Sequence, residues 1–194
     1  MDAVSHLVLD IQDTFSKNRY LTCLFLDIKG AYDSVDLDVL QCKLNNHKLS
    51  KKAAANTVEL FRDRQVFIRD HKGQLHGPAL TKRGLAQGSV LSPILFNVYT
   101  SDLHKLKNDT INIIQYADDI CIYTIQDTFS EAVRETRKVV GTLKKWMDDN
   151  NFTISAEKSA FLVFTRHRLQ KRDWLGCGDY RIPWVRCYKY LGVF

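Results

Sequence analysis

The sequence lacks a long hydrophobic run, a secretory leader and a cysteine framework. No apolar segment is long enough to cross a bilayer, and residues 1–13 have neither a basic start nor a continuous apolar stretch. The five cysteines are odd in number, and no two have Cys-x-x-Cys spacing. These absences argue against a disulfide scaffold and a structural zinc site. We expect buried thiols in an intracellular protein of the nucleus or cytoplasm, neither secreted nor bound to a membrane.

What is present is a globular composition with a modest excess of positive charge. Apolar residues make up 45% and charged residues 26% of the chain, which is typical of folded domains. Lysine and arginine number 28 against 22 aspartates and glutamates, giving a net charge of +6. A basic balance indicates a polyanionic partner such as a nucleic acid. By itself this signal is weak, because many soluble proteins are mildly basic.

Helical and extended patterns are interleaved along the chain, which indicates an α+β domain. Helices are expected over residues 2–16, 36–48, 50–62, 127–151 and a segment that begins near Pro93. Strands are expected over residues 21–28, 160–164, 188–194 and in two hairpins at 64–81 and 111–125. No repeat or linker interrupts the pattern. We therefore predict a single domain over residues 1–194, an antiparallel sheet backed by helices.

Two adjacent aspartates interrupt the apolar segment IIQYADDICIY, residues 113–123. Aspartate is depleted in strands and costly to bury without a partner, so Asp118 and Asp119 are expected at the turn of a hairpin. A second apolar run, LTCLFLDI, also ends at an aspartate, Asp27. If the two strands are neighbours, Asp27 and Asp118 come together at one edge of the sheet.

Two carboxylates that lie so near each other repel one another unless a cation lies between them. Carboxylate oxygens select Mg²⁺ or Mn²⁺, and two such ions about 4 Å apart support in-line phosphoryl displacement. For the tripeptide ADD alone, an ordinary aspartate-rich turn is the better interpretation. The second strand that ends at Asp27 favours a metal site.

Several segments resemble, in order and spacing, the palm motifs of reverse transcriptases. Within that family, they are most similar to the palm motifs of non-LTR retrotransposons. The three palm motifs are matched by LFLDIKGAYDSVD (24–36), GLAQGSVLSPILFNVY (84–99) and QYADD (115–119). Two later segments also fit the family: NNFTISAEKSAFLVF (150–164) resembles the part that carries a lysine, and YKYLGVF (188–194) resembles the primer-grip strand. The resemblance implies a polymerase palm with a metal-binding hairpin and part of the fingers. The thumb and the N-terminal fingers are expected to lie outside residues 1–194.

The resemblance also implies roles for the residues of the first and third motifs. Asp27 and Asp118 would be the main ligands of two metal ions, with the backbone carbonyl of Ile28 as a further oxygen. Asp119 would be a secondary ligand or an electrostatic support. Tyr32 would lie under the incoming sugar and exclude a 2′-hydroxyl, which selects deoxynucleotides. Without the motif, Tyr32 is better interpreted as a core tyrosine.

The second motif would contact the nucleotide or the template through Gln87, Gly88 and Ser89. Glycine permits close approach of a backbone, and helix N-termini favour phosphate. A flexible turn is the alternative for the tripeptide QGS alone. The family usually has proline before the glutamine, whereas Ala86 stands here. This departure loosens the loop but removes no chemical group.

Three residues of the later segments complete the implied site. Lys158 would protonate the departing pyrophosphate, and a solvated surface lysine is the alternative. Leu191 and Gly192 would hold the 3′ end of the primer by shape, and plain strand packing is the alternative.

The resemblance implies an RNA-directed DNA polymerase that uses an RNA template, a DNA primer and dNTPs. The primer 3′-hydroxyl would attack the α-phosphate of a dNTP, and pyrophosphate would leave. Two alternatives stay open: an inactive remnant that binds nucleic acid, and an RNA-templated RNA polymerase. Tyr32 argues against the second alternative, because such an enzyme accepts the 2′-hydroxyl. The oligomeric state is left open.

Overall fold

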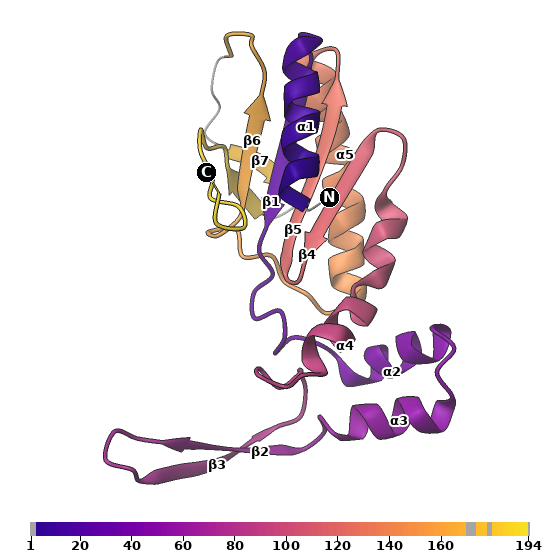
Figure 1. Cartoon of the computed structure of the whole chain (residues 1–194), viewed down its shortest axis with the longest axis vertical. Coiled ribbons are helices and arrows are strands. Elements are labelled where there is room, and N and C mark those ends of the chain that lie inside the picture. The colour runs from indigo at the N-terminus through magenta and orange to yellow at the C-terminus, as the bar shows by residue number, and fades with distance from the viewer. Residues whose placement is uncertain (1–2, 170–173, 178–179, 194) are drawn as a thin grey trace. The chain divides into compact units, whose positions relative to one another are not determined.

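The computed structural model of the protein describes residues 3–169, 174–177 and 180–193 (Figure 1). The chain forms two compact units, Met1–Lys29 with Asp102–Phe194, and Gly30–Ser101. We call the first the sheet unit and the second the helix–hairpin unit. Among the described residues, no helix is both long and apolar enough to span a bilayer.

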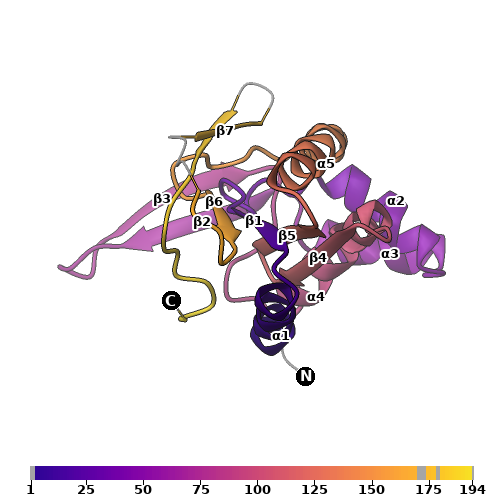
Figure 2. The same ribbon diagram turned by 90° about the horizontal axis from the view of Figure 1, so that it is seen from above.

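The sheet unit contains a four-stranded sheet with the strand order β4-β5-β1-β6 (Figure 2). Its strands are β1 (Tyr20–Leu26), β4 (Ile111–Tyr116), β5 (Asp119–Gln126) and β6 (Ala160–Phe164). All neighbouring pairs are antiparallel, and β1 lies between β5 and β6. Six of the seven residues of β1 are buried, as its nearly continuous apolar run predicts.

Two helices cover opposite faces of this sheet, α1 (Ala3–Ser16) and α5 (Phe129–Asp149) (Figure 2). Successive side chains of β1 point to opposite faces. Cys23 joins a buried cluster with Leu7 of α1, while the Thr22 hydroxyl lies 2.7 Å from the Thr136 hydroxyl of α5. The expected antiparallel sheet backed by helices is therefore confirmed.

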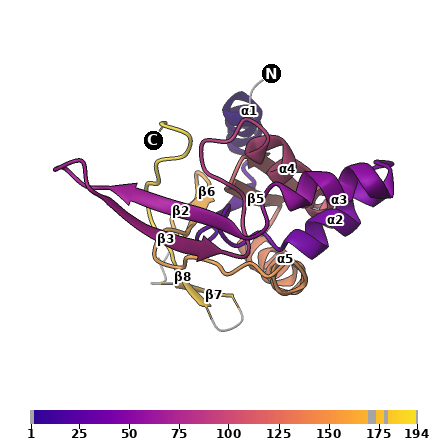
Figure 3. The same ribbon diagram turned by 90° about the horizontal axis from the view of Figure 1, so that it is seen from below.

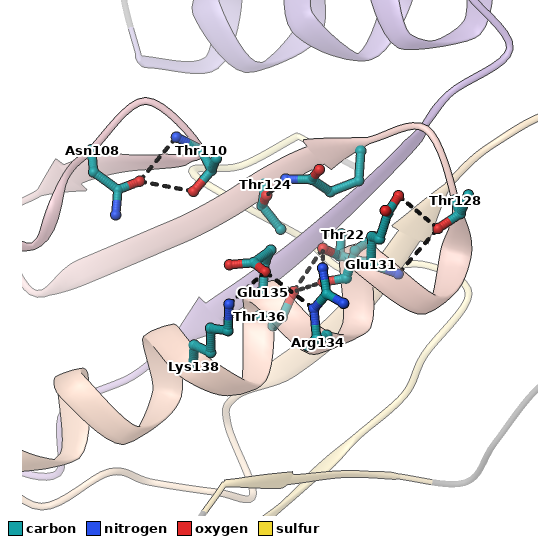
Figure 4. A network of polar contacts seen from close by, with 12 residues as sticks. Thr22, Asn108, Thr110, Thr124, Thr128, Glu131, Arg134, Glu135, Thr136 and Lys138 are labelled. Carbon is teal, nitrogen blue, oxygen red and sulfur yellow. Dashed lines mark hydrogen bonds and ion pairs between the residues drawn. The ribbon is translucent and has the colours of Figure 1, made fainter.

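The start of α5 is fixed by a reciprocal cap (Figure 4). Thr128 Oγ1 accepts a hydrogen bond from the Glu131 amide at 3.2 Å and donates one to Glu131 Oε2 at 2.8 Å. The first bond is an N-cap, which satisfies one of the amides that the first turn of a helix leaves unpaired. On the exposed side of the helix, Glu135 pairs with Lys138 at 2.8 Å and with Arg134 at 3.3 Å. These surface pairs contribute little stability.

The helix–hairpin unit contains three helices and one hairpin (Figure 3). Its elements are α2 (Leu37–Asn46), α3 (Lys51–Glu59), β2 (Arg64–Arg69), β3 (Leu75–Thr81) and α4 (Ser92–Tyr99). Asp36 caps α2 by accepting from the Asp38 and Val39 amides, and Ser50 caps α3 by accepting from the Ala53 amide. Helix α2 packs against both α3 and α4.

The expected strand over residues 188–194 is wrong for its described part. The Tyr190 amide donates to the Val193 carbonyl at 2.7 Å, and the Val193 amide donates back at 2.9 Å. Between them Leu191 (φ +48°) and Gly192 (φ +85°) both have left-handed backbone. Two successive positive φ angles produce a tight turn and cannot continue a strand. Phe194 lies outside the described residues.

Two further elements were not expected from the sequence, a 3₁₀ helix η1 (Ser101–Leu106) and a hairpin of β7 (Trp174–Cys177) with β8 (Tyr180–Pro183). The strands of this hairpin are only four residues long, too short for their alternation to be recognised. The expectation of buried thiols holds for Cys23 and Cys121 but is wrong for Cys42 and Cys187, which are exposed. Cys42 lies on the amphipathic helix α2, and Cys187 lies in an irregular segment after β8. The Cys177 side chain lies outside the described part.

Candidate active site

The register of the sheet brings two of the expected aspartates to one edge. The last pair of β1 and β5 is Leu26 with Ile120. Asp27 directly follows Leu26 and Asp119 directly precedes Ile120, so both aspartates lie at this end of the β1–β5 pair. β1 and β5 are therefore neighbours, as the sequence argument required.

The third aspartate lies at the tip of the β4–β5 hairpin. Tyr116 pairs with Asp119, so Ala117 and Asp118 form a two-residue turn. Ala117 has φ +53°, a left-handed conformation that costs an L-residue about 1–2 kcal/mol. The Gln115 side chain donates to the Ala117 carbonyl at 3.0 Å and holds the turn. Asp118 is thus presented by a strained and anchored turn next to Asp119.

Asp119 is affected electrostatically by the other two aspartates. Burial raises the pKa of the half-buried Asp119, and the charges of Asp118 and Asp27 raise it further. In the described part of the chain, no three His, Cys, Asp or Glu side chains are grouped closely enough to hold a metal ion. Asp119 therefore lies in the electrostatic field of Asp118 and Asp27, although the three carboxylates are not grouped as a ready metal site in the described part of the chain. A cation would remove the mutual repulsion.

The backbone that follows β1 is fixed by residues 153–159. The Asp27 amide donates to Ser159 Oγ at 3.2 Å, and the Asp27 carbonyl accepts from the Ser155 amide at 2.9 Å. Ile28 is buried and forms an isolated bridge with Ile154. Sequence reasoning missed Ser155 and Ser159. The signal that could have found them is their position on either side of Lys158, with small hydroxyl side chains that can bond to a nearby backbone.

Lys158 belongs to the same segment and has an exposed side chain. Its amide donates to the Ser155 carbonyl at 3.1 Å, within a turn. Its own carbonyl accepts from the Tyr188 hydroxyl at 2.9 Å. The structure therefore places the Lys158 backbone near Asp27 through shared partners. Its role in proton transfer stays a prediction.

Tyr188 lies beside the aspartate edge, and the sequence argument gave it no role. Its ring stacks on Phe25 with centroids 4.8 Å apart. Burial raises the pKa of Tyr188, and the charges of Asp119 and Asp27 raise it further. Its position in the YKYLGVF segment was the signal that could have found it. Leu191, in the same segment, packs against the buried cluster around Cys23, and the expected primer role of Leu191 and Gly192 stays a prediction.

In the helix–hairpin unit, Tyr32 is half-buried and stacks on Phe96 with centroids 4.9 Å apart and an interplanar angle of 18°. The Tyr32 carbonyl accepts from the Leu85 amide at 2.8 Å. Gly84 has φ +81°, and a Cβ there would lie 2.7 Å from the Asp33 Cα atom. Only glycine fits this approach. The segment of the second motif is thus held against the end of the first motif.

The remaining residues of the second motif form the entry to α4. The exposed Gln87 donates through Nε2 to Asp33 Oδ2 at 3.3 Å. Gly88 has φ +88° with open space around the position of a Cβ. The Ser89 hydroxyl accepts from the Leu91 amide at 3.4 Å, just before α4 begins. Gln87 and Gly88 are exposed in this turn. The contacts of Gln87, Gly88 and Ser89 with substrate stay predictions.

Comparison with known proteins identifies the family. The family model described as reverse transcriptase (RNA-dependent DNA polymerase) matches residues 3–194. This chain belongs to the reverse transcriptase family. The RNA-directed DNA polymerase from mobile element jockey of Drosophila funebris is 26% identical over 187 residues, which cover 93% of this chain and 20% of that protein. The probable RNA-directed DNA polymerase from transposon X-element of Drosophila melanogaster is 24% identical over 196 residues, covering 100% of this chain and 21% of the relative.

Solved structures share the fold of this reverse transcriptase domain. Telomerase from Candida tropicalis, in complex with a fragment of telomeric RNA, superposes with a TM-score of 0.60 at 12% identity, over 88% of this chain and 31% of that chain. Apo telomerase from the same organism, truncated from its C-terminal domain, gives a TM-score of 0.58 at 16% identity over 93% and 38%. The expected polymerase palm fold and the non-LTR reverse transcriptase type are confirmed.

Proposed function

We propose that this reverse transcriptase domain is the core of an RNA-directed DNA polymerase that extends a primer 3′-hydroxyl with dNTPs. The observation that carries the proposal is that the charges of Asp118 and Asp27 both act on Asp119, at the end of the β1–β5 pair. The chain spans about a fifth of the length of the curated relatives it matches. The activity is therefore proposed for the protein that carries this domain.

The donor set fits divalent metal ions, which reverse transcriptases generally use. Asp27 and Asp118 would hold two Mg²⁺ or Mn²⁺ ions, with the Ile28 carbonyl and Asp119 as further oxygens. Carboxylate and carbonyl oxygens suit these cations, and the repulsion that Asp118 and Asp27 exert on Asp119 supports a cation there. When bound, such ions stabilise charge on the attacking and leaving oxygens.

The other residues would bind and orient the substrates. Tyr32, held by its stacking on Phe96, would exclude a ribonucleotide by contact with its 2′-hydroxyl. Gln87, Gly88 and Ser89 would contact the nucleotide or template through their open turn. Lys158 would hold a proton for the departing pyrophosphate.

The proposed partners are an RNA template, a DNA primer and dNTPs. The relatives are named as RNA-directed DNA polymerases, and one structural neighbour was solved with telomeric RNA. The net charge of +6 supports a polyanionic partner. Leu191 and Gly192, at their tight turn, would meet the primer end.

Primer extension tests the proposal directly. The protein that carries this domain should extend a DNA primer on an RNA template with dNTPs and Mg²⁺ or Mn²⁺, and use rNTPs poorly. Extension with rNTPs as efficient as with dNTPs would favour an RNA-templated RNA polymerase. Nucleic-acid binding with no extension under either condition would favour an inactive binding module.

Two further measurements separate metal binding from sugar choice. In residues 1–194, Mn²⁺ should broaden the NMR signals of Asp118 and Asp119 first, and Asp27→Asn should weaken this effect. Tyr32→Val should raise ribonucleotide use relative to deoxynucleotide use, because it removes a repulsion against the wrong sugar. Unchanged sugar discrimination in an active Tyr32→Val variant would show that Tyr32 is only a packing residue.

A further inference from the structure

The turn that carries Lys158 is anchored to the aspartate edge on one side. The Ser155 amide donates to the Asp27 carbonyl at 2.9 Å, and the Asp27 amide donates to Ser159 Oγ at 3.2 Å. The Ser159 hydroxyl in turn donates to the Ser155 carbonyl at 2.8 Å. The backbone before and after Lys158 is therefore tied to Asp27.

A single side chain anchors the same turn on the other side. The Tyr188 hydroxyl donates to the Lys158 carbonyl at 2.9 Å. The Tyr188 ring stacks on Phe25 at 4.8 Å with an interplanar angle of 22°. Phe25 is only 3% exposed and lies two residues before Asp27, on the same face of β1. A half-buried ring stacked on a buried one has few rotamers, so its hydroxyl is a fixed donor.

We propose that Tyr188 is a positioning residue that holds the Lys158 turn at the edge formed by Asp27 and Asp119. This inference rests on the proposed function, in which Lys158 Nζ gives one proton to the leaving oxygen of pyrophosphate and becomes a neutral amine. Tyr188 touches no reacting atom in this role. It acts through the Lys158 backbone, because a lysine ammonium group on a long flexible stem is oriented best when its main chain is fixed.

The chain offers a matched control two residues away. Tyr190 is 6% exposed, and its hydroxyl is buried without a hydrogen-bond partner among the described residues. Its ring also lies 4.8 Å from the Phe25 ring. Tyr188→Phe and Tyr190→Phe each remove one hydroxyl and keep one ring in contact with Phe25. Only Tyr188→Phe removes a hydrogen bond to the Lys158 turn.

Steady-state kinetics of the protein that carries this domain test the role. Loss of one hydrogen bond should lower the kcat of Tyr188→Phe about fivefold and leave the KM for dNTP unchanged. Tyr190→Phe should behave as the wild type. In a Lys158→Ala background, Tyr188→Phe should have no further effect, because the group it positions is gone. An additive loss, or a wild-type kcat for Tyr188→Phe, overturns the proposal.

Amide hydrogen exchange in residues 1–194 tests the anchor without any activity. Tyr188→Phe should speed exchange of the Ser155 and Ser159 amides about fivefold, and Tyr190→Phe should not. Equal exchange in the two variants would overturn the positioning role even in an active enzyme. If the wild type extends no primer but Tyr188→Phe loosens the turn, the proposed function fails while the anchor stands.

Discussion

Two hairpins of this reverse transcriptase domain give aspartate opposite environments. The β4–β5 hairpin lies inside a four-stranded sheet, and Ile120 to Tyr123 of β5 are at most 3% exposed. The β2–β3 hairpin is a separate two-stranded sheet, where Phe67 is 52% and Ile68 67% exposed. A hairpin that pairs with no third strand is only marginally stable in water. Pairing with β1 and packing against helices α1 and α5 bury β5.

The tips of the two hairpins differ in how their aspartates are satisfied. At the β2–β3 tip, Asp70 Oδ1 accepts from the Lys72 amide at 2.8 Å and the Gln74 amide at 2.9 Å, and Oδ2 lies 3.1 Å from His76 Nε2. At the β4–β5 tip, Asp118 and Asp119 lie beside the charge of Asp27. An aspartate that completes its own turn is structural. Aspartates that repel one another are candidates for a cation site.

The largest expected difference between the hairpins is in catalysis. Asp118→Asn should lower primer extension roughly a thousandfold, because a neutral amide forfeits several kcal/mol of charge stabilisation. Asp70→Asn should leave extension unchanged, because its carboxylate serves only its turn. Single-nucleotide extension rates of the protein that carries this domain give both numbers. Equal losses in the two variants would contradict the assignment of the site to the β4–β5 tip.

The next difference is in stability. Ile120→Ala should lower the free energy of unfolding by about 2–5 kcal/mol, because it opens a cavity at a side chain that is 1% exposed. Ile68→Ala should change it by about 0.5 kcal/mol or less, since that side chain is already in water. Urea unfolding followed by circular dichroism measures both. A loss at Ile68 as large as that at Ile120 would mean that the β2–β3 hairpin is covered by a partner.

A smaller effect is expected from exchanging the turn residues. Ala117→Gly should stabilise the protein by up to about 1 kcal/mol, because glycine accepts φ +53° without the left-handed penalty. Gly73→Ala should destabilise it by about 1 kcal/mol, since Gly73 has φ +81° with no crowding atoms. Thermal unfolding checks both signs. Destabilisation by Ala117→Gly would show that the turn is not strained at this residue.

The smallest expected effect is in proton binding. The pKa of Asp119 is raised by burial and by Asp118 and Asp27, so its contribution to stability falls as pH rises from the ordinary aspartate pKa through the raised one. The pKa of Asp70 is lowered by its bonds with His76 and the Gln74 amide, so its contribution is lost as pH falls through that lowered value. NMR titration of the metal-free protein should show the two aspartates on opposite sides of the ordinary value.

A variant links this titration to the site. Asp118→Asn should lower the pKa of Asp119, because it removes one of the two neighbouring charges. Asp70 should titrate as before. An unchanged Asp119 pKa in this variant would leave burial and the charge of Asp27 as its causes.

Much of the fold was predictable because it depends on local pattern. Helix α5, the strand Ala160–Phe164 and the caps at Asp36 and Ser50 follow from periodicity and from residues that bond to nearby amides. The turn at Leu191 and Gly192 was mistaken for a strand because its apolar and aromatic residues imitate one. Backbone angles, not composition, distinguish the two.

The sequence by itself determined most of the element types, the positions of the three aspartates at the ends of apolar runs, and the family. It did so because periodicity and motif order lie in neighbouring residues. Only the tertiary structure decided that Asp27 and Asp119 lie at the same end of the β1–β5 pair, that Tyr188 and Asp27 hold the Lys158 turn from two sides, and that Asp70 is bonded within its turn while Asp119 lies among like charges. The β1–β5 register and the Tyr188 contact join residues far apart in the chain, and their geometry follows from how whole strands and rings pack. The Asp70 turn is local, whereas the environment of Asp119 depends on its burial and on the charge of Asp27, which is distant in the chain.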